Sequence, residues 1–202
     1  MSVRRATTAA TLLALAGVRL AAQWGGYAAL GARAGTSLVH DVIVQPIDLR
    51  QTVALTVAAG VTTPTEGAWS GEAALDVTAG GLRRDEAAAT LDLGGLTTVS
   101  FTVAVRRALG PGFAARAGAG ALFYMPEHDA GVFRDGTAGA TPVGLVGVTW
   151  APAVGKRRRL ALDLRYDVHR FITPALRDVG FTESRVVHRL ALAVRAGIGG
   201  AP

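Results

Sequence analysis

Apolar and polar residues alternate along the segment 160–169, which reads Leu-Ala-Leu-Asp-Leu-Arg-Tyr-Asp-Val-His. Leu160 and Leu164 fall on one side of this alternation, whereas Asp163 and Asp167 fall on the other. Successive side chains of an extended strand point to opposite faces, so a period of two predicts a β-strand. One face of this strand is apolar and the other is densely charged. Such a strand suits a closed sheet whose charged face is enclosed and whose apolar face meets lipid.

The same pattern recurs along the chain and predicts eight strands. Each segment matches the about 9–11 residues of a tilted transmembrane strand. The segments are 26–37, 49–62, 69–80, 96–107, 112–124, 141–151, 160–169 and 186–198. In the segment 141–151 both faces are apolar or small, so the pattern does not say which face is enclosed.

The connections between these segments alternate in length. Short connections marked by proline and glycine are expected at 63–68, 109–111 and 152–156. Longer polar connections are expected at 38–48, 81–95, 125–140 and 171–185. Short turns on one side and long loops on the other are typical of outer-membrane barrels.

Strand parity assigns a set of charged side chains to the enclosed face. An eight-stranded barrel is just wide enough to be filled by side chains. Charges that are dry and unpaired are costly, so these groups are expected to pair or to contact trapped water. The sequence therefore favours an ion-pair network that plugs the lumen, with a narrow anion-favouring path along the surplus arginines as the alternative. The inward set is Arg33, Arg50, Glu72, Asp76, Arg106, Arg116, Asp163, Arg165, Asp167, Arg189 and Arg195.

Aromatic residues gather near both ends of the predicted strands. Two girdles of aromatic rings at the membrane interfaces are expected for a barrel in lipid. Tyr27 is an exception, because its parity places it inward with Arg33. The expected interface residues are Trp24, Trp69, Phe113 and Trp150 on the side of the short connections, and Phe123, Tyr124 and Phe171 on the other side.

Composition and charge exclude several classes of protein. The 202 residues suit one domain, and the absence of cysteine excludes disulfides and thiolate chemistry. Three of the 21 basic residues and none of the 15 acidic ones lie in the first 22 positions. The remaining chain is nearly balanced and has no basic stripe with interleaved aromatics, so nucleic-acid binding is not expected. Hydrophobic residues make up 50% of the chain, yet no apolar run approaches the roughly 18 residues of a spanning helix.

The first 22 residues have the pattern of a secretory signal peptide. Arg4 and Arg5 supply the positive start, 9–18 is apolar, and Leu20-Ala21-Ala22 supplies small residues before Gln23. We expect residues 1–22 to be removed and residues 23–202 to form one barrel domain.

With these features the chain resembles the small eight-stranded outer-membrane barrels of the OmpA, OmpX and OmpW kind. The resemblance rests on the strand pattern and extends from Gln23 to about Gly200. It implies an all-β fold, an eight-stranded antiparallel up-and-down transmembrane barrel in the outer membrane of a Gram-negative bacterium. It also implies contact with outer-membrane lipid and lipopolysaccharide, handling by the barrel-assembly machinery, and an extracellular ligand bound by the long loops. The expected role is structural or in surface interaction.

Two other roles remain open. One is a narrow pore or transporter for small apolar or anionic solutes, as proposed for OmpW-like barrels. The other is a secreted lipocalin-like carrier, which needs an apolar interior and a polar exterior. The alternation at 160–169 is the inverse of that arrangement.

Candidate catalytic groups are few, and no enzyme activity, cofactor or metal is expected. His40, His128 and His169 lie in or beside the long connections, and Glu127-His128-Asp129 lacks the spacing of metal ligands. Barrels that modify lipid A share the architecture, but this chain offers no matching arrangement of His, Ser and Glu. The basic run 156–159 at the last short connection is expected to be a solvated turn, with contact to phosphate head groups or peptidoglycan as the alternative.

Overall fold

The computed structural model describes residues 24–41, 47–86, 89–128, 131–134, 139–152, 160–178 and 180–198. The expected signal peptide at 1–22, Asp129 and the basic run 156–159 lie outside the described residues. Within the described ranges, no helix is both long enough and apolar enough to cross a membrane.

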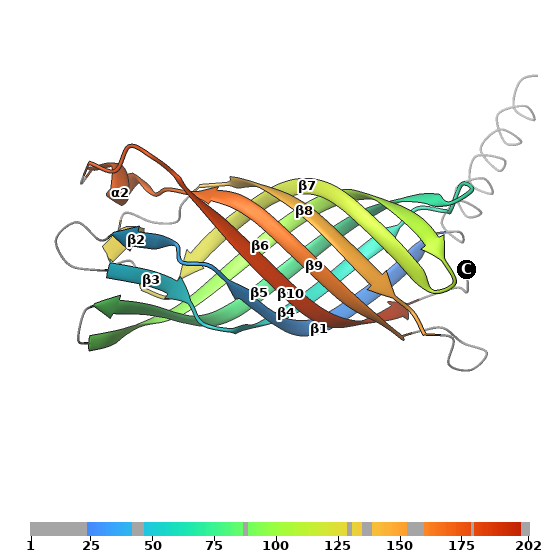
Figure 1. Ribbon diagram of the computed structural model, residues 1–202, viewed down its shortest axis with the longest axis horizontal. Helices are drawn as coiled ribbons and strands as arrows, with labels where there is room; N and C mark the ends of the chain where they lie inside the picture. Colours follow the sequence, from blue (N-terminus) through green and yellow to red (C-terminus); the bar gives the residue numbers. More distant parts are fainter. Residues whose placement is uncertain are drawn as a thin grey trace, which may run out of the picture.

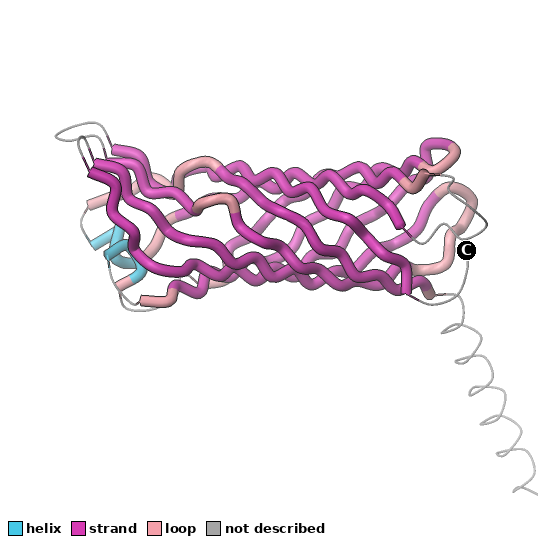
Figure 2. Tube along the Cα trace, turned by 90° about the horizontal axis from the view of Figure 1, so that it is seen from below, coloured by secondary structure: helices cyan, strands magenta, loops and turns pink. Residues whose placement is uncertain are grey.

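Eight antiparallel strands close into a ring, which confirms the predicted fold class. The order around the ring is β5-β4-β1-β10-β9-β8-β7-β6, and pairing of β5 with β6 closes it (Figures 1 and 2). The ring strands are β1 (Gly25–Gly35), β4 (Ala54–Thr62), β5 (Trp69–Glu86), β6 (Ala89–Gly110), β7 (Phe113–Pro126), β8 (Thr141–Trp150), β9 (Leu160–Phe171) and β10 (Arg185–Ile198).

Four short elements lie at the end of the barrel that carries the long connections, on the left in Figure 1. We call this the long-connection end and the opposite one the short-connection end. Strand β3 pairs with β5 beyond the end of β4, and β2 pairs with β3. The four elements are β2 (Val39–Asp41), β3 (Ile47–Gln51), the 3-10 helix η1 (Gly131–Phe133) and the short helix α2 (Pro174–Asp178).

The predicted second strand is interrupted, and the interruption corrects one inward assignment. Strands β3 and β4 are separated by Thr52 and Val53, and the backbone of Thr52 donates to the Gly81 carbonyl. Across this break the inward positions change parity, as expected when a strand slips by one residue. Leu49 is therefore buried, while Arg50, predicted to face the lumen, is exposed and pairs with Asp85 at 2.9 Å.

The segment 81–95 was expected to be a long polar connection, and that expectation is wrong. Most of it extends the β5–β6 hairpin, with Arg83 opposite Asp92 and Glu86 opposite Ala89. Leu82 keeps the inward parity of Asp76 and Thr78 and is buried, and the pairing of β5 with β6 shifts in register between Gly81 and Arg83.

The outer face of the barrel is apolar. Leu160, Leu164 and the outward residues of the other strands expose large hydrophobic side chains, with Leu160 61% exposed. The sequence pattern did not say which face of β8 is enclosed. In the structure Val143 is buried and Val146 is exposed. A continuous apolar surface of this kind is costly in water and is the expected exterior of a lipid-embedded barrel.

Candidate functional site in the barrel lumen

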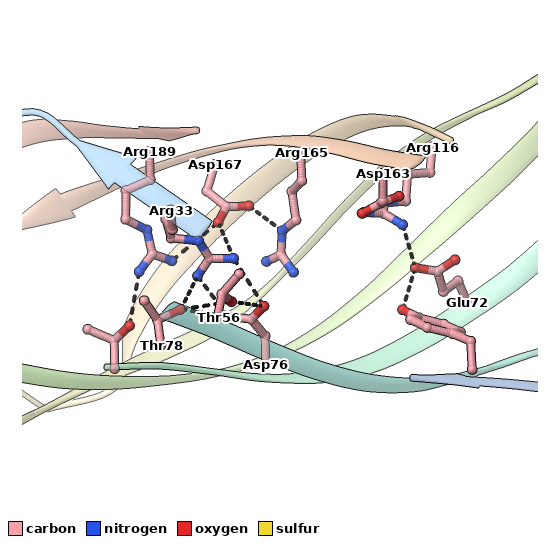
Figure 3. Close-up of polar contacts among 12 residues, drawn as sticks. Arg33, Thr56, Glu72, Asp76, Thr78, Arg116, Asp163, Arg165, Asp167 and Arg189 are labelled. Atoms are coloured by element: carbon pink, nitrogen blue, oxygen red, sulfur yellow. Dashed lines mark hydrogen bonds and ion pairs between the residues drawn. The ribbon is translucent and has the colours of Figure 1, made fainter. Parts of the chain in front are cut away.

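The lumen collects charged side chains from the inward positions of six strands, β1, β5, β6, β7, β9 and β10. Of the eleven charges predicted to face inward, nine are buried and Arg106 is partly buried, whereas Arg50 lies outside. These ten lumen charges fall into two groups at different positions along the barrel, and Figure 3 draws most of them. We call them the middle network and the lower network, the latter being nearer the short-connection end. The middle network consists of Arg33, Thr56, Asp76, Thr78, Thr98, Arg165, Asp167 and Arg189, and the lower network of Tyr27, Glu72, Arg106, Arg116, Thr149, Asp163 and Arg195.

Asp167 is the centre of the middle network. Arg165 Nε donates to its Oδ1 at 2.6 Å, and Arg189 Nη2 donates to its Oδ2 at 3.3 Å. Arg33 Nη2 lies 3.6 Å from the same Oδ2. Three guanidinium groups therefore share one carboxylate that is only 1% exposed (Figure 3).

Arg33 also connects opposite parts of the barrel. Its two terminal nitrogens donate to the two oxygens of Asp76 at 2.7 and 3.1 Å, the paired geometry that makes arginine–carboxylate contacts strong. Thr56 donates to Asp76 at 3.0 Å, and Arg33 donates to Thr78 at 3.0 Å. Arg189 similarly reaches Thr98 at 3.3 Å. The threonine hydroxyls thus add hydrogen bonds to both the arginines and the carboxylate of these ion pairs.

Glu72 is the corresponding centre of the lower network. It accepts from Arg116 Nη1 at 3.1 Å, from Arg195 Nη1 at 2.9 Å and from the Tyr27 hydroxyl at 2.9 Å. Arg116 Nη2 also donates to Asp163 at 2.6 Å. These contacts join β5, β7, β9 and β10 across the lumen. Charge-assisted bonds of this type are about twice as strong as neutral ones.

The lower network also depends on a close approach between Tyr27 and Gly60. The two residues are paired in register, and a Cβ at Gly60 would lie 2.5 Å from the Tyr27 ring. On its other side the ring carries the Arg195 guanidinium, 3.2 Å from the centroid, as a cation–π contact. Gly60 thus leaves the space in which Tyr27 reaches Glu72.

Substituting Gly60 by valine is expected to destabilise the barrel by about 1–3 kcal/mol, because it overpacks this contact and displaces the Tyr27 ring. Urea unfolding in lipid vesicles, followed by heat-modifiable gel mobility, measures the loss. Gly139→Val is the matched control, since no atom of the described residues lies within 4 Å of a Cβ there. Equal stability of the two variants would contradict the proposed role of Gly60.

A third group of lumen residues, the outer apolar core, lies at the long-connection end. Tyr124 packs edge-on against Phe171 with ring centroids 5.1 Å apart, and Phe133 of η1 lies 5.9 Å from Phe171. The Tyr124 hydroxyl is 2.5 Å from His169 Nε2. The complete set is Leu38, Leu49, Leu82, Leu96, Leu122, Tyr124, Phe133, Val143, Phe171, Leu176 and Val187.

This core corrects two of the predicted interface aromatics. Tyr124 and Phe171 were expected in the outer girdle, but both are buried inside the barrel. Their inward parity decides their orientation, and Phe133 and Leu176 from the connections cover them. The other predicted girdle residues, Trp24, Trp69, Phe113, Trp150 and Phe123, have exposed side chains.

The candidate catalytic groups do not converge on a site. His169 is buried in β9, beside Tyr124, and not in a loop. Glu127 accepts the Gly95 backbone N–H at 2.6 Å, and His40 lies 3.8 Å from Asp48. Among the residues that the structure describes, no three His, Cys, Asp or Glu side chains are grouped so as to hold a metal.

Solved structures similar to this chain were found. Ail, the attachment invasion locus protein of Yersinia pestis, in complex with the heparin analogue sucrose octasulfate, matches with a TM-score of 0.53 and 10% identity over 87% of this chain and 99% of that chain. OprG, an outer membrane protein of Pseudomonas aeruginosa, matches with a TM-score of 0.47 and 10% identity over 88% and 95%. No family model matches the chain, and the search of curated proteins also finds no match.

This chain has the fold of a small outer-membrane β-barrel. Two features of the barrel agree with a location in the outer membrane. Its exterior is apolar, and ten charged side chains face the lumen. A lipocalin-like carrier needs the opposite arrangement, so the geometry does not favour that alternative.

The sequence pattern identified the charged residues of the site, but it gave no role in the networks to their neutral partners, although it placed Tyr27 on the inward face. Tyr27, Thr56, Thr78, Thr98 and Thr149 all donate to or accept from the networks. For Tyr27, Thr78 and Thr98 the available signal was inward parity in strands that also carry inward charges. Thr56 and Thr149 lie in strands without charged residues, so only their parity could have indicated them. A hydroxyl beside charged inward neighbours is a natural hydrogen-bond partner in a closed lumen.

Proposed function

We propose that this chain is an outer-membrane barrel with a closed lumen and a structural or surface-interaction role. The observation that supports closure most directly is the stacking of three side-chain layers along the lumen. The lower and middle networks cross-link strands that are not neighbours in the ring, and the outer apolar core fills the long-connection end.

The two ionic layers support closure because their contacts cross the lumen. The Arg33–Asp76 pair joins β1 to β5, and Glu72 of β5 binds Arg116 of β7 and Arg195 of β10. A hydrated ion passing this region must separate pairs that are almost fully buried. Separating a buried pair typically costs about 3–5 kcal/mol.

The outer apolar core adds a barrier of a different kind. Leu122, Tyr124 and Phe133 are essentially inaccessible to solvent. An ion entering such a region loses its hydration without gaining polar partners, which is strongly unfavourable. This layer therefore opposes anions and cations alike, whereas the arginine surplus favours anions only.

Recording in planar lipid bilayers tests closure. The full chain, inserted at high salt, is expected to produce no discrete current steps, because the three layers leave no continuous aqueous path. A conducting porin inserted under the same conditions provides the positive control, and gel mobility confirms that the inserted barrel is folded. Discrete anion-selective steps would contradict closure and support the narrow-pore alternative, which the surplus of lumen arginines favours.

The surface role is supported by the elements at the long-connection end. The β5–β6 hairpin continues past the end of β4, and β2 and β3 lie beside it (Figure 1). Two ion pairs lie at this surface, Arg50 of β3 with Asp85 and Arg84 with Glu86. A ligand at this described surface meets alternating charges and not a uniform basic field, so a sulfated glycan like the one bound to Ail is not the ligand we favour. Lipopolysaccharide and the barrel-assembly machinery remain predicted partners.

A further inference from the structure

A small cavity lies between the middle and lower networks. Arg33, Asp76 and Arg165 line it from the middle network, and Arg116 and Asp163 line it from the lower one. Alanine side chains on β1, β4 and β10 leave the space open. The cavity has room for about one or two water molecules.

The charges of the middle network do not balance. It contains three arginines, Arg33, Arg165 and Arg189, and two carboxylates, Asp76 and Asp167, and all five groups are buried. In the lower network the extra arginine is Arg106, which is only partly buried and is therefore closer to solvent. One positive charge of the middle network is thus left without a buried counter-charge among the described residues. An uncompensated buried charge is strongly unfavourable.

Two arginines that line the cavity have a buried donor without a hydrogen-bond partner among the described residues: Arg33 at Nε and Arg165 at a terminal nitrogen. Both terminal nitrogens of Arg33 bind Asp76, so Arg165 is the one with an unused terminal donor. Its Nε binds Asp167, but its Nη2 is buried and has no hydrogen-bond partner among the described residues. In Figure 3 the guanidinium extends away from the backbone of β9 into the space between the two networks.

The carboxylates that line the cavity already have partners. Asp76 is bound by Arg33 and Thr56, and Asp163 is bound by Arg116 and Thr149. Neither carboxylate therefore neutralises Arg165. The negative charges of Asp76 and Asp163 are already balanced by Arg33 and Arg116.

We propose that this cavity binds one small monovalent anion, of the size of chloride, against the guanidinium of Arg165. The anion supplies the counter-charge that the middle network lacks and accepts from the unused Nη2. Larger anions such as sulfate or gluconate do not fit in a space of one or two water molecules. The site is independent of closure, because a barrel can hold this anion whether or not it conducts.

Bromide provides a direct test, because it replaces chloride and scatters anomalously. Crystals of the full chain grown in bromide are expected to show an anomalous peak in the cavity, within contact distance of Arg165. Absence of a peak, with ordinary water density in the cavity, would overturn the proposal.

The dependence of stability on the anion provides a second test. The unfolding temperature in detergent is expected to be higher in sodium chloride or bromide than in sodium gluconate at equal ionic strength. Arg165→Gln is expected to lose this difference, because it removes the surplus charge and the free donor together. Arg50→Gln is the control: Arg50 is exposed, so this variant keeps the difference. A chloride effect of equal size in Arg165→Gln and in the unaltered protein would refute a specific site.

Discussion

Asp167→Asn is expected to lower the free energy of unfolding by about 3–5 kcal/mol, because it leaves buried arginines without their shared counter-charge. Asp167 holds Arg165 and Arg189 through hydrogen bonds, and Arg33 lies 3.6 Å away. An asparagine keeps the size of the side chain but removes its charge. The loss of unfolding free energy therefore measures an electrostatic effect and not the creation of a cavity. Urea unfolding in lipid vesicles, monitored by heat-modifiable gel mobility, measures it.

Two further variants make this result specific. Asp85→Asn removes the partner of Arg50 from an exposed pair, and such pairs are worth about 0–1 kcal/mol. Combining Asp167→Asn with Arg165→Gln removes one uncompensated positive charge, so the double variant is expected to recover part of the loss. Equal losses for Asp167→Asn and Asp85→Asn, or a purely additive double variant, would show that Asp167 is not the electrostatic centre of the lumen.

The sequence alone predicted the barrel because two different environments act on alternate residues of every strand. Where lipid faces one side and the lumen the other, as in β9, Leu164 and Arg165 cannot exchange places without burying a charge in an apolar surrounding. The period of two is then imposed along the whole spanning segment. Strand number, orientation and the inward charges follow from it.

Past the spanning segment this constraint disappears, and the predictions weaken there. Residues 83–86 and 89–92 form a hairpin but read as a polar connection, because polar side chains are acceptable on both of its faces. The slip at Thr52 and Val53 is also invisible in the pattern, because it transfers a single charged residue, Arg50, to the other face.

The outer apolar core could not be predicted for a related reason. An aromatic residue near a strand end fits either an interface girdle or a core, and Tyr124 and Phe171 were assigned to the girdle. Their partners Phe133 and Leu176 come from connections that have no periodicity to indicate which way they face. Pairings across the lumen, such as Arg33 with Asp76, depend on the stagger of strands around the ring, which alternation does not specify.

Leu164→Arg is expected to reduce the free energy of folding into a bilayer by about 2–4 kcal/mol, because it places a charge near the middle of the lipid-facing surface. Leu164 lies in the centre of the apolar part of β9 and is 46% exposed in the absence of lipid. Its neighbours in register are Leu192 of β10 and Val148 of β8, both exposed and apolar. Urea titration in phospholipid vesicles measures the change.

The depth of the substitution separates a lipid-facing surface from any other apolar surface. Leu160→Arg places the same charge at the first residue of β9, beside the short connections, where the cost in a membrane falls to about 0–1 kcal/mol. Both leucines are exposed, so a water-soluble barrel gives no reason for the two variants to differ, and arginine at either position would improve its solubility. A graded loss from Leu160 to Leu164 is therefore expected only if this face is embedded in lipid. Equal and small effects at both positions, in a protein that stays soluble without detergent, would contradict the membrane-spanning barrel.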